Sequence, residues 1–241
     1  MKNYHYIAST PSTNILLKEL VRKEKLPEFF AVRTAFQSAG KGQLGNSWEA
    51  ERGKNMLCSV LLYPHSVAIH EQFMISQMVS VAILRVLQKY GVDCCIKWPN
   101  DIYVGNKKLG GILIENSLRG SKIDFSIIGI GLNINQKEFK SNAPNPVSTF
   151  NILQKKLSVK EIFSEIMTEI KNLYLYTDIA VVKSEYLQYL FRKTGFYSFK
   201  IPNGEVFEAA IDTIGSDGQL WLKKRDGNLS GFYFKEVEFI F

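Results

Sequence analysis

Apolar residues recur at helical spacing over residues 71–90 and predict the clearest helix of the chain. Within this stretch they occupy positions 75, 78, 79, 82, 83, 86 and 87, which lie on one face of an α-helix. Gly91 follows directly, and glycine is the residue that most often ends a helix. Similar spacing predicts three further helices, at residues 12–22, 158–174 and 179–191.

Short apolar runs bounded by turn-forming residues predict strands between these helices. The strand predicted at residues 125–134 is interrupted by Gly129 and Gly131. A glycine in a strand leaves room for another part of the chain, or for a ligand, to approach the backbone closely. The predicted strands are residues 29–34, 56–63, 94–98, 102–104, 109–115 and 125–134.

The pattern changes after residue 191, where closely spaced turn signals indicate a small all-β module. Asn-Gly, Ser-Asp-Gly and Asp-Gly-Asn sequences separate its four apolar runs, which are residues 197–202, 205–214, 219–224 and 229–241. We therefore divide the chain into two domains, residues 1–191 and 192–241. No proline- or glycine-rich linker marks the boundary between them.

The positive charge of the chain lies entirely in its first part. Of the 241 residues, 46% are hydrophobic and 22% are charged, which is typical of a globular protein in water. Residues 1–190 hold 23 basic and 16 acidic side chains, whereas residues 191–241 hold seven of each, so the first part accounts for the net charge of +7. Such a surplus either serves solubility or attracts an anionic ligand or partner, and charge alone does not decide between the two.

Nothing in the sequence indicates a membrane or secreted protein. The N-terminus lacks the apolar core of a signal peptide, and no apolar run approaches the roughly 18 residues of a membrane span. Cys58, Cys94 and Cys95 are odd in number and lack the spacing of a metal site, so we expect them to be buried and reduced. We therefore expect a cytoplasmic protein.

The segment KWPNDIYVGNKKLGGILIE, which begins at Lys97, carries more polar side chains than a core strand needs. Asn100 and Asp101 lie close in sequence to Lys107 and Lys108. Such a cluster of polar and positively charged side chains is suited to binding an anion. Asp101 could give one oxygen ligand to a phosphate-bound Mg²⁺. One of the two adjacent lysines should point inward, and an inward lysine needs a negative partner. The alternative is an ordinary turn followed by two solvated lysines.

A second segment, QSAGKGQLGNSWEAERGKN at residues 37–55, combines four glycines with three cations and a tryptophan. Glycines let several backbone N–H groups point at one anion. The Gly-x-Gly-x-x-Gly match at Gly40, Gly42 and Gly45 is weak evidence of a dinucleotide site, because no strand–helix context supports it. The alternative is a flexible surface loop. We expect this loop to be disordered without a ligand, since ordering its glycines is costly.

Four segments, in this order, resemble the biotin–protein ligases. They are Ser-Thr-Asn at residues 12–14, the glycine-rich residues 37–48, the lysine-rich residues 97–115, and Gly-Ile-Gly-Leu-Asn-Ile-Asn at residues 129–135. A fifth segment, residues 204–222, is similar to the small C-terminal module of that family. The resemblance covers nearly the whole chain. It implies an α+β fold in which a mixed β-sheet flanked by helices, as in class II synthetases and biotin–lipoate ligases, is followed by a small SH3-like β-barrel.

The resemblance implies a two-step ligase reaction. Biotin and ATP condense to biotinyl-5′-AMP and pyrophosphate, and biotin then passes to the acceptor lysine of a biotin carboxyl carrier domain of acetyl-CoA carboxylase or a related carboxylase. Lys108 is implied as the catalytic residue, which bridges the biotin carboxylate and the α-phosphate, and Asp101 as the ligand of Mg²⁺. The resemblance assigns biotin contacts to Ser12, Thr13, Asn14, Gln37, Lys41, Gly42, Gln43, Trp48, Lys108 and Gly111, and ATP contacts to Lys41, Asn100 and Asn133.

The chain departs from the family pattern in the glycine-rich loop. The family usually has Gly-Arg-Gly-Arg-x-Gly, whereas this loop reads GKGQLG, with Lys41 and Gln43 in place of the two arginines. Gln43 cannot supply the missing charge, and lysine is not equivalent to arginine at position 41. We therefore expect the adenylate to be held less tightly, unless Arg52 or Lys54 compensates.

The resemblance is to the ligase-only form of the family. The Ser-Thr-Asn segment begins at residue 12, which leaves no room in this chain for a preceding helix-turn-helix domain, so we expect no DNA partner. Three other functions are kept as alternatives. A lipoate–protein ligase would carry a different lysine motif, a regulatory biotin-binding module would not need the nucleotide-side residues, and a nucleic-acid-binding protein would carry stacking motifs. The sequence leaves open which carrier is modified and whether the chain forms a homodimer.

Overall fold

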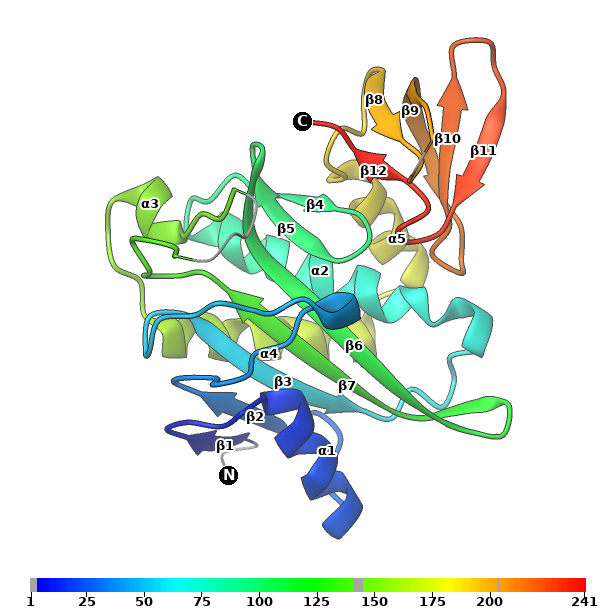
Figure 1. Cartoon of the computed structure of the whole chain (residues 1–241). Helices are drawn as coiled ribbons and strands as arrows, with labels where there is room; N and C mark the ends of the chain where they lie inside the picture. Colours follow the sequence, from blue (N-terminus) through cyan, green and yellow to red (C-terminus); the bar gives the residue numbers. More distant parts are fainter. Residues whose placement is uncertain (1–3, 141–144, 203) are drawn as a thin grey trace.

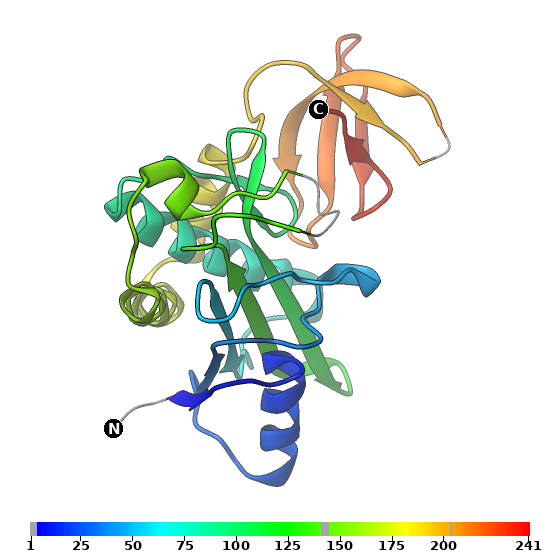
Figure 2. The same cartoon turned by 60° about the vertical axis from the view of Figure 1, so that its left-hand side comes forward.

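The computed structural model describes residues 4–140, 145–202 and 204–241. It contains two β-sheets, one of seven strands and one of five strands. Figures 1 and 2 show the larger sheet with helices on both of its faces, and the smaller sheet set apart at the C-terminal end of the chain. The α+β fold with a mixed sheet flanked by helices is therefore confirmed.

The seven-stranded sheet is mixed because one of its strand pairs is parallel. Its order is β1 (Tyr4–Ile7), β2 (Ala31–Thr34), β3 (Met56–Leu62), β7 (Lys122–Leu132), β6 (Lys107–Arg119), β5 (Asp101–Val104) and β4 (Cys95–Lys97). Strands β1 and β2 run parallel, and all other neighbours run antiparallel. The long hairpin of β6 and β7 forms the middle of the sheet.

Two features of this sheet were not predicted. Strand β1 is an edge strand of four residues with no clear apolar alternation, so its sequence carries no strand signal. Strands β6 and β7 together extend well beyond the predicted runs, because they continue as a hairpin whose far end is exposed and polar. Hydrophobic patterning marks only the buried part of such a hairpin.

A group of helices covers one face of the sheet, and a further helix covers part of the other face (Figure 1). The first group is α2 (Phe73–Lys89), α4 (Val159–Tyr176) and α5 (Ile179–Gln188), accompanied by the short α3 (Thr149–Leu153). On the opposite face, α1 (Thr13–Lys23) packs Leu17 against Val32, Leu61 and Ile127. The four longer helices confirm the predicted ones, whereas α3, with five residues, is too short to show a period.

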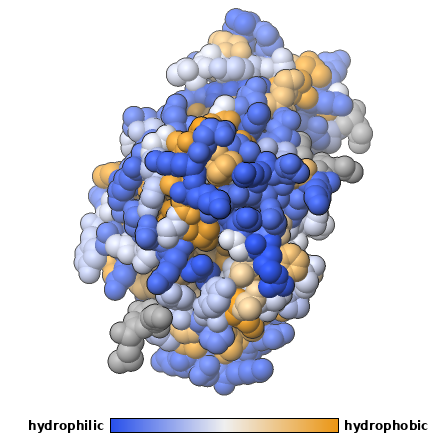
Figure 3. All heavy atoms as spheres, turned by 90° about the vertical axis from the view of Figure 1, so that its left-hand side faces the viewer, coloured by the Kyte–Doolittle hydropathy of each residue, from blue (hydrophilic) through white to orange (hydrophobic). Residues whose placement is uncertain are grey.

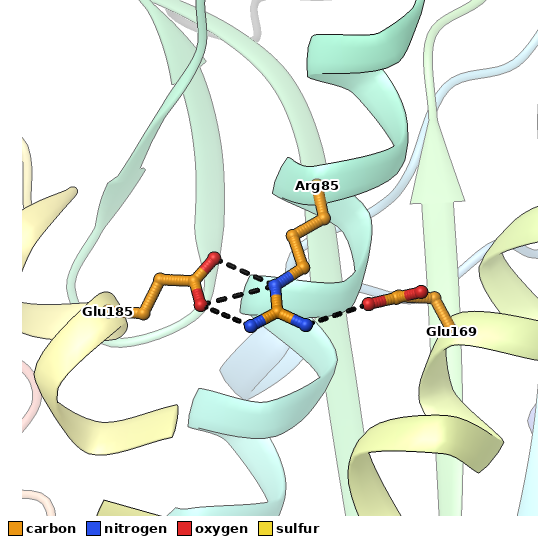
Figure 4. Close-up of polar contacts among 3 residues, drawn as sticks. All are labelled: Arg85, Glu169 and Glu185. Carbon is orange, nitrogen blue, oxygen red and sulfur yellow. Dashed lines mark hydrogen bonds and ion pairs between the residues drawn. The ribbon is translucent and has the colours of Figure 1, made fainter. Parts of the chain in front are cut away.

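Arg85 of α2 ties the three helices of the larger group together (Figure 4). Its guanidinium donates from Nε and Nη2 to Glu185 of α5, and from Nη1 to Glu169 of α4 at 2.9 Å. The hydrogen bonds to Glu185, followed by the one to Glu169, raise the pKa of Arg85. Paired bonds of this kind fix orientation as well as position. The helical layer behind the sheet is thus held as one unit.

The five-stranded sheet is antiparallel throughout and forms the C-terminal module. Its order is β11 (Leu229–Phe232), β10 (Leu220–Lys224), β9 (Val206–Ile214), β8 (Tyr197–Lys200) and β12 (Glu238–Phe239). The predicted strand over residues 229–241 is instead two strands. Among the described residues, β11 and β12 are the two edges and do not pair, so the sheet of the SH3-like module is open and does not close into a full barrel.

The module packs against the segment that begins at Lys97. Trp98 is buried and donates from Nε1 to the carbonyl oxygen of Gly218 at 2.8 Å. A Cβ on Gly218 would lie 2.7 Å from the ring of Phe73, so α2 touches the same turn. The division of the chain at residue 191 stays a prediction, because the two sheets meet in a packed contact.

Among the helices of the described residues, none combines the length and the apolar character that crossing a bilayer requires. Figure 3 shows a face of the molecule on which hydrophilic side chains prevail and hydrophobic ones form small groups.

Candidate functional site

A cleft of about 180 Å³ lies on the sheet face that carries α1, over strands β6 and β7. We call it the central cleft. Gly129 and Gly131 form part of its floor. A Cβ on Gly131 would lie 2.6 Å from the ring of Trp48, and one on Gly129 would lie 2.4 Å from Oδ1 of Asn14. The expected close approach to these two glycines is therefore confirmed.

Every predicted site residue except Asn133 lines the central cleft. They come from the start of α1, the glycine-rich loop, and strands β5 and β6. In Figures 1 and 2 the glycine-rich loop crosses the sheet face opposite α2 and α4. Residues far apart in the sequence are thus brought together at one place.

The start of α1 is held by a buried polar network. Thr13 donates from its backbone N and from Oγ1 to Oε1 of Gln37, at 2.8 and 3.0 Å. Oγ of Ser59, on β3, lies 2.7 Å from Oγ1 of Thr13 and 2.6 Å from Oδ1 of Asn14. Asn14 in turn donates from Nδ2 to Oε2 of Glu115 at 2.6 Å. These contacts fix the orientation of the side chains that face the cleft.

Ser59 and Glu115 belong to this network and were missed by sequence reasoning. The signal for Ser59 was a single polar residue in the otherwise apolar strand MLCSVLL, every residue of which is buried. Ser12 occupies the N-cap position of α1, yet within the described structure its side chain makes no capping bond. Its hydroxyl is therefore available to a ligand.

Lys108 and Asp101 form an ion pair at the cleft. Nζ of Lys108 lies 2.7 Å from Oδ1 of Asp101, with the two side chains 30% and 19% exposed. Nζ also lies 5.7 Å from the centre of the Trp48 ring system. Lys107 is exposed. The prediction that one of the two adjacent lysines points inward and meets a negative partner is confirmed.

The backbone between Trp98 and Asp101 is fixed from three sides. Asn100 donates from Nδ2 to the carbonyl oxygen of Ile112 on β6, and accepts from the backbone N of Ile112 at 3.0 Å. The carbonyl oxygen of Pro99 accepts from Oγ of Ser76 on α2 and from Oη of Tyr186 on α5, both at 3.2 Å. Asp101 therefore follows a segment with little freedom to move.

The glycine-rich loop folds back on itself above the cleft, around η1 (Gln43–Gly45). The backbone N of Trp48 donates to the carbonyl oxygen of Gly40 at 2.9 Å, and that of Gly42 donates to Asn46 at 2.6 Å. Oε1 of Gln43 and Nε1 of Trp48 are buried without a partner among the described residues. One acceptor and one donor are thus left for a ligand. The predicted disorder of this loop stays a prediction.

Arg52 and Lys54 do not take the place of the missing arginine. Arg52 donates from Nη1 to the carbonyl oxygen of Ala8 at 3.1 Å and lies over the ring of Phe36 at 4.9 Å. Lys54 pairs with Glu51 at 4.0 Å. Neither lines the central cleft. The charge that Gln43 lacks is therefore not restored by these two residues.

Asn133 lies beside the central cleft, behind the backbone of Lys108. Its Nδ2 donates to the carbonyl oxygen of Val147 at 3.2 Å, and the backbone N of Val147 donates to the carbonyl oxygen of Lys108 at 2.9 Å. Oδ1 of Asn133 is buried without a partner among the described residues. Its contact with ATP stays a prediction. The sequence NAPNP at residues 142–146 also predicts a loop, and most of it lies outside the described residues.

Lys97 lines the cleft but contacts the C-terminal module. Its Nζ lies 5.2, 5.0 and 5.5 Å from the ring centres of Tyr103, Phe239 and Phe241, in the manner of a cation–π contact. Burial lowers the pKa of Lys97, against the opposing attraction of Asp101. Sequence reasoning did not anticipate this aromatic surrounding, because two of the rings come from the far end of the chain.

The cleft can offer a metal one carboxylate. Asp101 is the one acidic side chain among the described residues that line it, and no group of three metal-binding side chains occurs in the described part of the chain. Mg²⁺ bound to phosphates usually takes one or two carboxylates and keeps several waters. The residues present therefore fit a magnesium ion that arrives with a phosphate ligand, and do not form a cage of their own.

Comparisons with known proteins agree on one family. The model of the biotin/lipoate A/B protein ligase family matches residues 6–133. The bifunctional ligase/repressor BirA of Bacillus subtilis is 32% identical over 135 residues, and the biotin–[acetyl-CoA-carboxylase] ligase of Paracoccus denitrificans is 31% identical over 134 residues. The matches cover 56% and 53% of this chain, and 40% and 53% of those proteins. The chain thus spans about half the length of these relatives or less.

The fold is shared with solved structures over nearly the whole chain. The biotin protein ligase of Aquifex aeolicus, in complex with biotin and ATP, superimposes with a TM-score of 0.81. It is 20% identical, and the match covers 99% of this chain and 98% of that one. At this identity the likeness concerns the fold, including the C-terminal module.

Proposed function

Because the chain belongs to the biotin/lipoate A/B protein ligase family, we propose that it activates biotin with ATP and then transfers biotin to a protein lysine. The intermediate would be biotinyl-5′-AMP, and the acceptor a biotin carboxyl carrier domain of acetyl-CoA carboxylase or a related carboxylase. The name of the Paracoccus relative supports this acceptor, and the biotin and ATP bound to the Aquifex protein support the two substrates.

The observation that carries the proposal is the concentration of lysines over a glycine floor. Lys41, Lys97 and Lys108 all line the central cleft, where Asp101 is the one acidic side chain among the described lining residues. In the first step a carboxylate oxygen of biotin attacks the α-phosphorus of ATP, the new P–O bond forms, and pyrophosphate leaves. Two anions must meet, so positive groups placed in advance lower the barrier. Lys108, fixed by its ion pair, is the group we assign to this role.

The remaining cleft residues suit the other parts of the two substrates. Ser12, Thr13, Asn14 and Gln37 offer hydroxyl and amide groups to the neutral ureido ring of biotin, and Trp48 and Gly111 form the wall and floor beside it. Lys41, Gly42 and Gln43 would contact the carboxylate end of biotin. Lys41, Asn100 and Asn133 would contact ATP, and Asp101 would hold Mg²⁺, which neutralises phosphate charge when bound. We place the reaction in the cytoplasm, since the described structure leaves all three cysteines free.

The outer edge of β6 suits carrier docking. Strand β5 pairs with β6 only up to Gly111, and in the described structure the rest of the outer edge has no partner strand. A carrier strand added there would bring its lysine towards the central cleft. An acidic carrier would also be attracted by the net charge of +7. Whether the same edge serves a homodimer is left open.

The test is biotin-dependent exchange of pyrophosphate into ATP. We expect Lys108→Ala to lower the exchange rate by roughly 10²–10³-fold, the scale of removing one preorganised donor. Lys107→Ala, which removes the exposed neighbour, is the matched control and should exchange like the wild type. A near-wild-type rate in Lys108→Ala would refute the role of Lys108. Because the family also includes lipoate ligases, exchange that requires lipoate instead of biotin would move the proposal to that substrate.

A further inference from the structure

A second cavity of about 230 Å³ adjoins the central cleft. We call it the side cavity. It is bounded by the start of α2, the outer edge of β6 and two turns of the C-terminal module. Residues such as Gln43, Asn100 and Phe234 line both spaces, so the two lie side by side. The side cavity therefore lies next to the central cleft, between the two parts of the molecule.

The charges of the two spaces are opposite. Three lysines line the central cleft, whereas among the described residues that line the side cavity there is no cation, and Asp217 is the one charged side chain. Asp217 accepts from Oη of Tyr233 at 2.6 Å and from the backbone N of Gln219 at 3.1 Å. The hydrogen bond from Tyr233, followed by that from Gln219, lowers the pKa of Asp217. Its carboxylate therefore stays ionised at neutral pH.

The boundary between the two spaces carries a hydrogen-bond acceptor without a partner. Oε1 of Gln43 is buried and makes no hydrogen bond to any described residue. An arginine at this position would instead put a cation at the boundary. A glutamine oxygen suits a donor such as an amine, so both Asp217 and Gln43 favour a ligand that carries N–H groups.

We propose that the side cavity is the entry path of the acceptor lysine, with Asp217 attracting its ammonium group at the mouth and Gln43 receiving its amine at the inner end. This proposal rests on the proposed ligase function and names the path of its second substrate. Pyrophosphate, the other species that must cross the cleft, is an anion and would be repelled by Asp217.

The reaction at the inner end is a simple acyl transfer. The lysine gives one proton to water and becomes a neutral amine. Its nitrogen attacks the acyl carbon of biotinyl-5′-AMP, a C–N bond forms, and the bond from the acyl carbon to the phosphate oxygen breaks. AMP leaves with the electron pair, and the second amine proton passes to water. No oxidant or further reactant is needed.

The experiment uses the full chain with preformed biotinyl-5′-AMP and two small acceptors, N-acetyl-lysine amide and hydroxylamine. N-acetyl-lysine amide carries a positively charged ammonium group, whereas hydroxylamine is small and uncharged. We expect Asp217→Asn to lower kcat/KM for the lysine about three-fold relative to that for hydroxylamine, the scale of an exposed charge pair. Asp226→Asn is the matched control. Asp226 also accepts from a backbone N two residues on, at 2.9 Å, in an exposed turn of the same module that does not border the cavity.

A second variant keeps the proposal testable if the Asp217 turn fails to form. Asn116 of β6 lines the side cavity, so Asn116→Lys places a cation there. We expect about ten-fold lower kcat/KM for the lysine with little change for hydroxylamine. If both variants use the two acceptors in the wild-type ratio, the entry path is refuted. If the wild type shows no biotin-dependent pyrophosphate exchange, the ligase function is refuted instead. Failure of the entry path and failure of the ligase function are therefore distinguishable.

Discussion

At the scale of single residues, Gln43 separates this chain from the pattern it otherwise resembles. The resemblance places an arginine there, and the structure shows that Arg52 and Lys54 are engaged elsewhere. Oε1 of Gln43 is buried without a partner in the described part of the chain. We expect this neutral hydrogen-bond acceptor to hold the anionic biotinyl-5′-AMP weakly.

We predict that Gln43→Arg slows the release of biotinyl-5′-AMP at least ten-fold. The reason is that a hydrogen bond from a charged donor contributes about 1.5–3 kcal/mol. The measurement is the fraction of adenylate retained on the protein after rapid filtration. Gln43→Met, which removes the amide without adding charge, is the control and should not improve retention. Complete retention by the wild type would contradict the prediction.

Single residues also show where sequence reasoning reached its limit. The inward direction of one lysine followed from strand alternation, and Lys108 meets Asp101 as expected. Ser76 and Tyr186, which hold the carbonyl oxygen of Pro99, could not be found in this way. They lie 23 and 87 residues from Pro99, and nothing local distinguishes their hydroxyl groups from others on a helix. A contact between distant segments is decided by packing alone.

At the scale of elements, helices α2 and α5 act on the cleft from behind the sheet. The hydroxyl of Tyr186 is part of a fully buried side chain, whose ring also meets Phe73 edge-on at 5.8 Å. Burial, followed by the charge of Asp101, raises the pKa of Tyr186. The hydroxyl therefore stays protonated at neutral pH and can donate to the carbonyl oxygen of Pro99.

We predict that Tyr186→Phe lowers kcat of biotin-dependent pyrophosphate exchange about ten-fold and raises the Mg²⁺ concentration needed for half-maximal rate. In this variant the carbonyl oxygen of Pro99 loses one of its two hydrogen bonds, so the backbone before Asp101 is freer to shift. Small displacements of reacting groups lower the reaction rate strongly. The affinity for biotin should not change. Tyr186 is a positioning residue here, so the shift in magnesium dependence is the informative measurement.

The matched control for this variant is Tyr174→Phe. Oη of Tyr174, on α4, also donates to a backbone carbonyl oxygen far along the chain, that of Tyr63, at 3.3 Å. It does not line the central cleft. If both variants lose similar stability and only Tyr186→Phe changes the magnesium dependence, the positioning role holds. Equal exchange kinetics in the two variants would exclude it.

The helices and strands also differ in how well the sequence predicts them. Helix α2 was predicted nearly to its ends, because its apolar face is long and periodic. The sheet and two other helices pack against it and bury most of its residues. Strand β1 and helix α3 are too short for any period to appear. The length of β6 was underestimated, since its outer half is exposed and its partner β7 supplies the hydrogen bonds.

At the scale of the whole molecule, the site depends on how the two parts meet. The turn signals of the C-terminal module were sufficient to predict its strands, but not that its edges stay unpaired. Nor could they show that Phe239 and Phe241 surround Lys97, or that Gly218 accepts from Trp98. The lysine that begins the most informative segment of the sequence is therefore part of a contact between the two parts.

This contact gives the stability of the molecule a pH dependence with a definite sign. Burial lowers the pKa of Lys97 below its ordinary value of 10.5, Asp101 opposes this shift, and Lys108 and Arg192 add to it by repulsion. Between the lowered pKa and 10.5 the unfolded chain binds more protons at this lysine than the folded chain does. The contribution of Lys97 to the free energy of unfolding must therefore rise with pH over that interval.

We predict that the free energy of unfolding of the wild type, minus that of Lys97→Met, becomes more positive as the pH rises from about 8 towards about 10, approaching the ordinary lysine pKa. Methionine fills a similar volume among the rings and carries no proton, so the difference isolates this one group from the tyrosines and other lysines that titrate nearby. Urea unfolding of both proteins at several pH values measures it. A difference that stays constant, or that shifts in favour of the variant, would mean that the aromatic rings offset the desolvation of Lys97. In that case the contact between the two parts would stabilise the ammonium form.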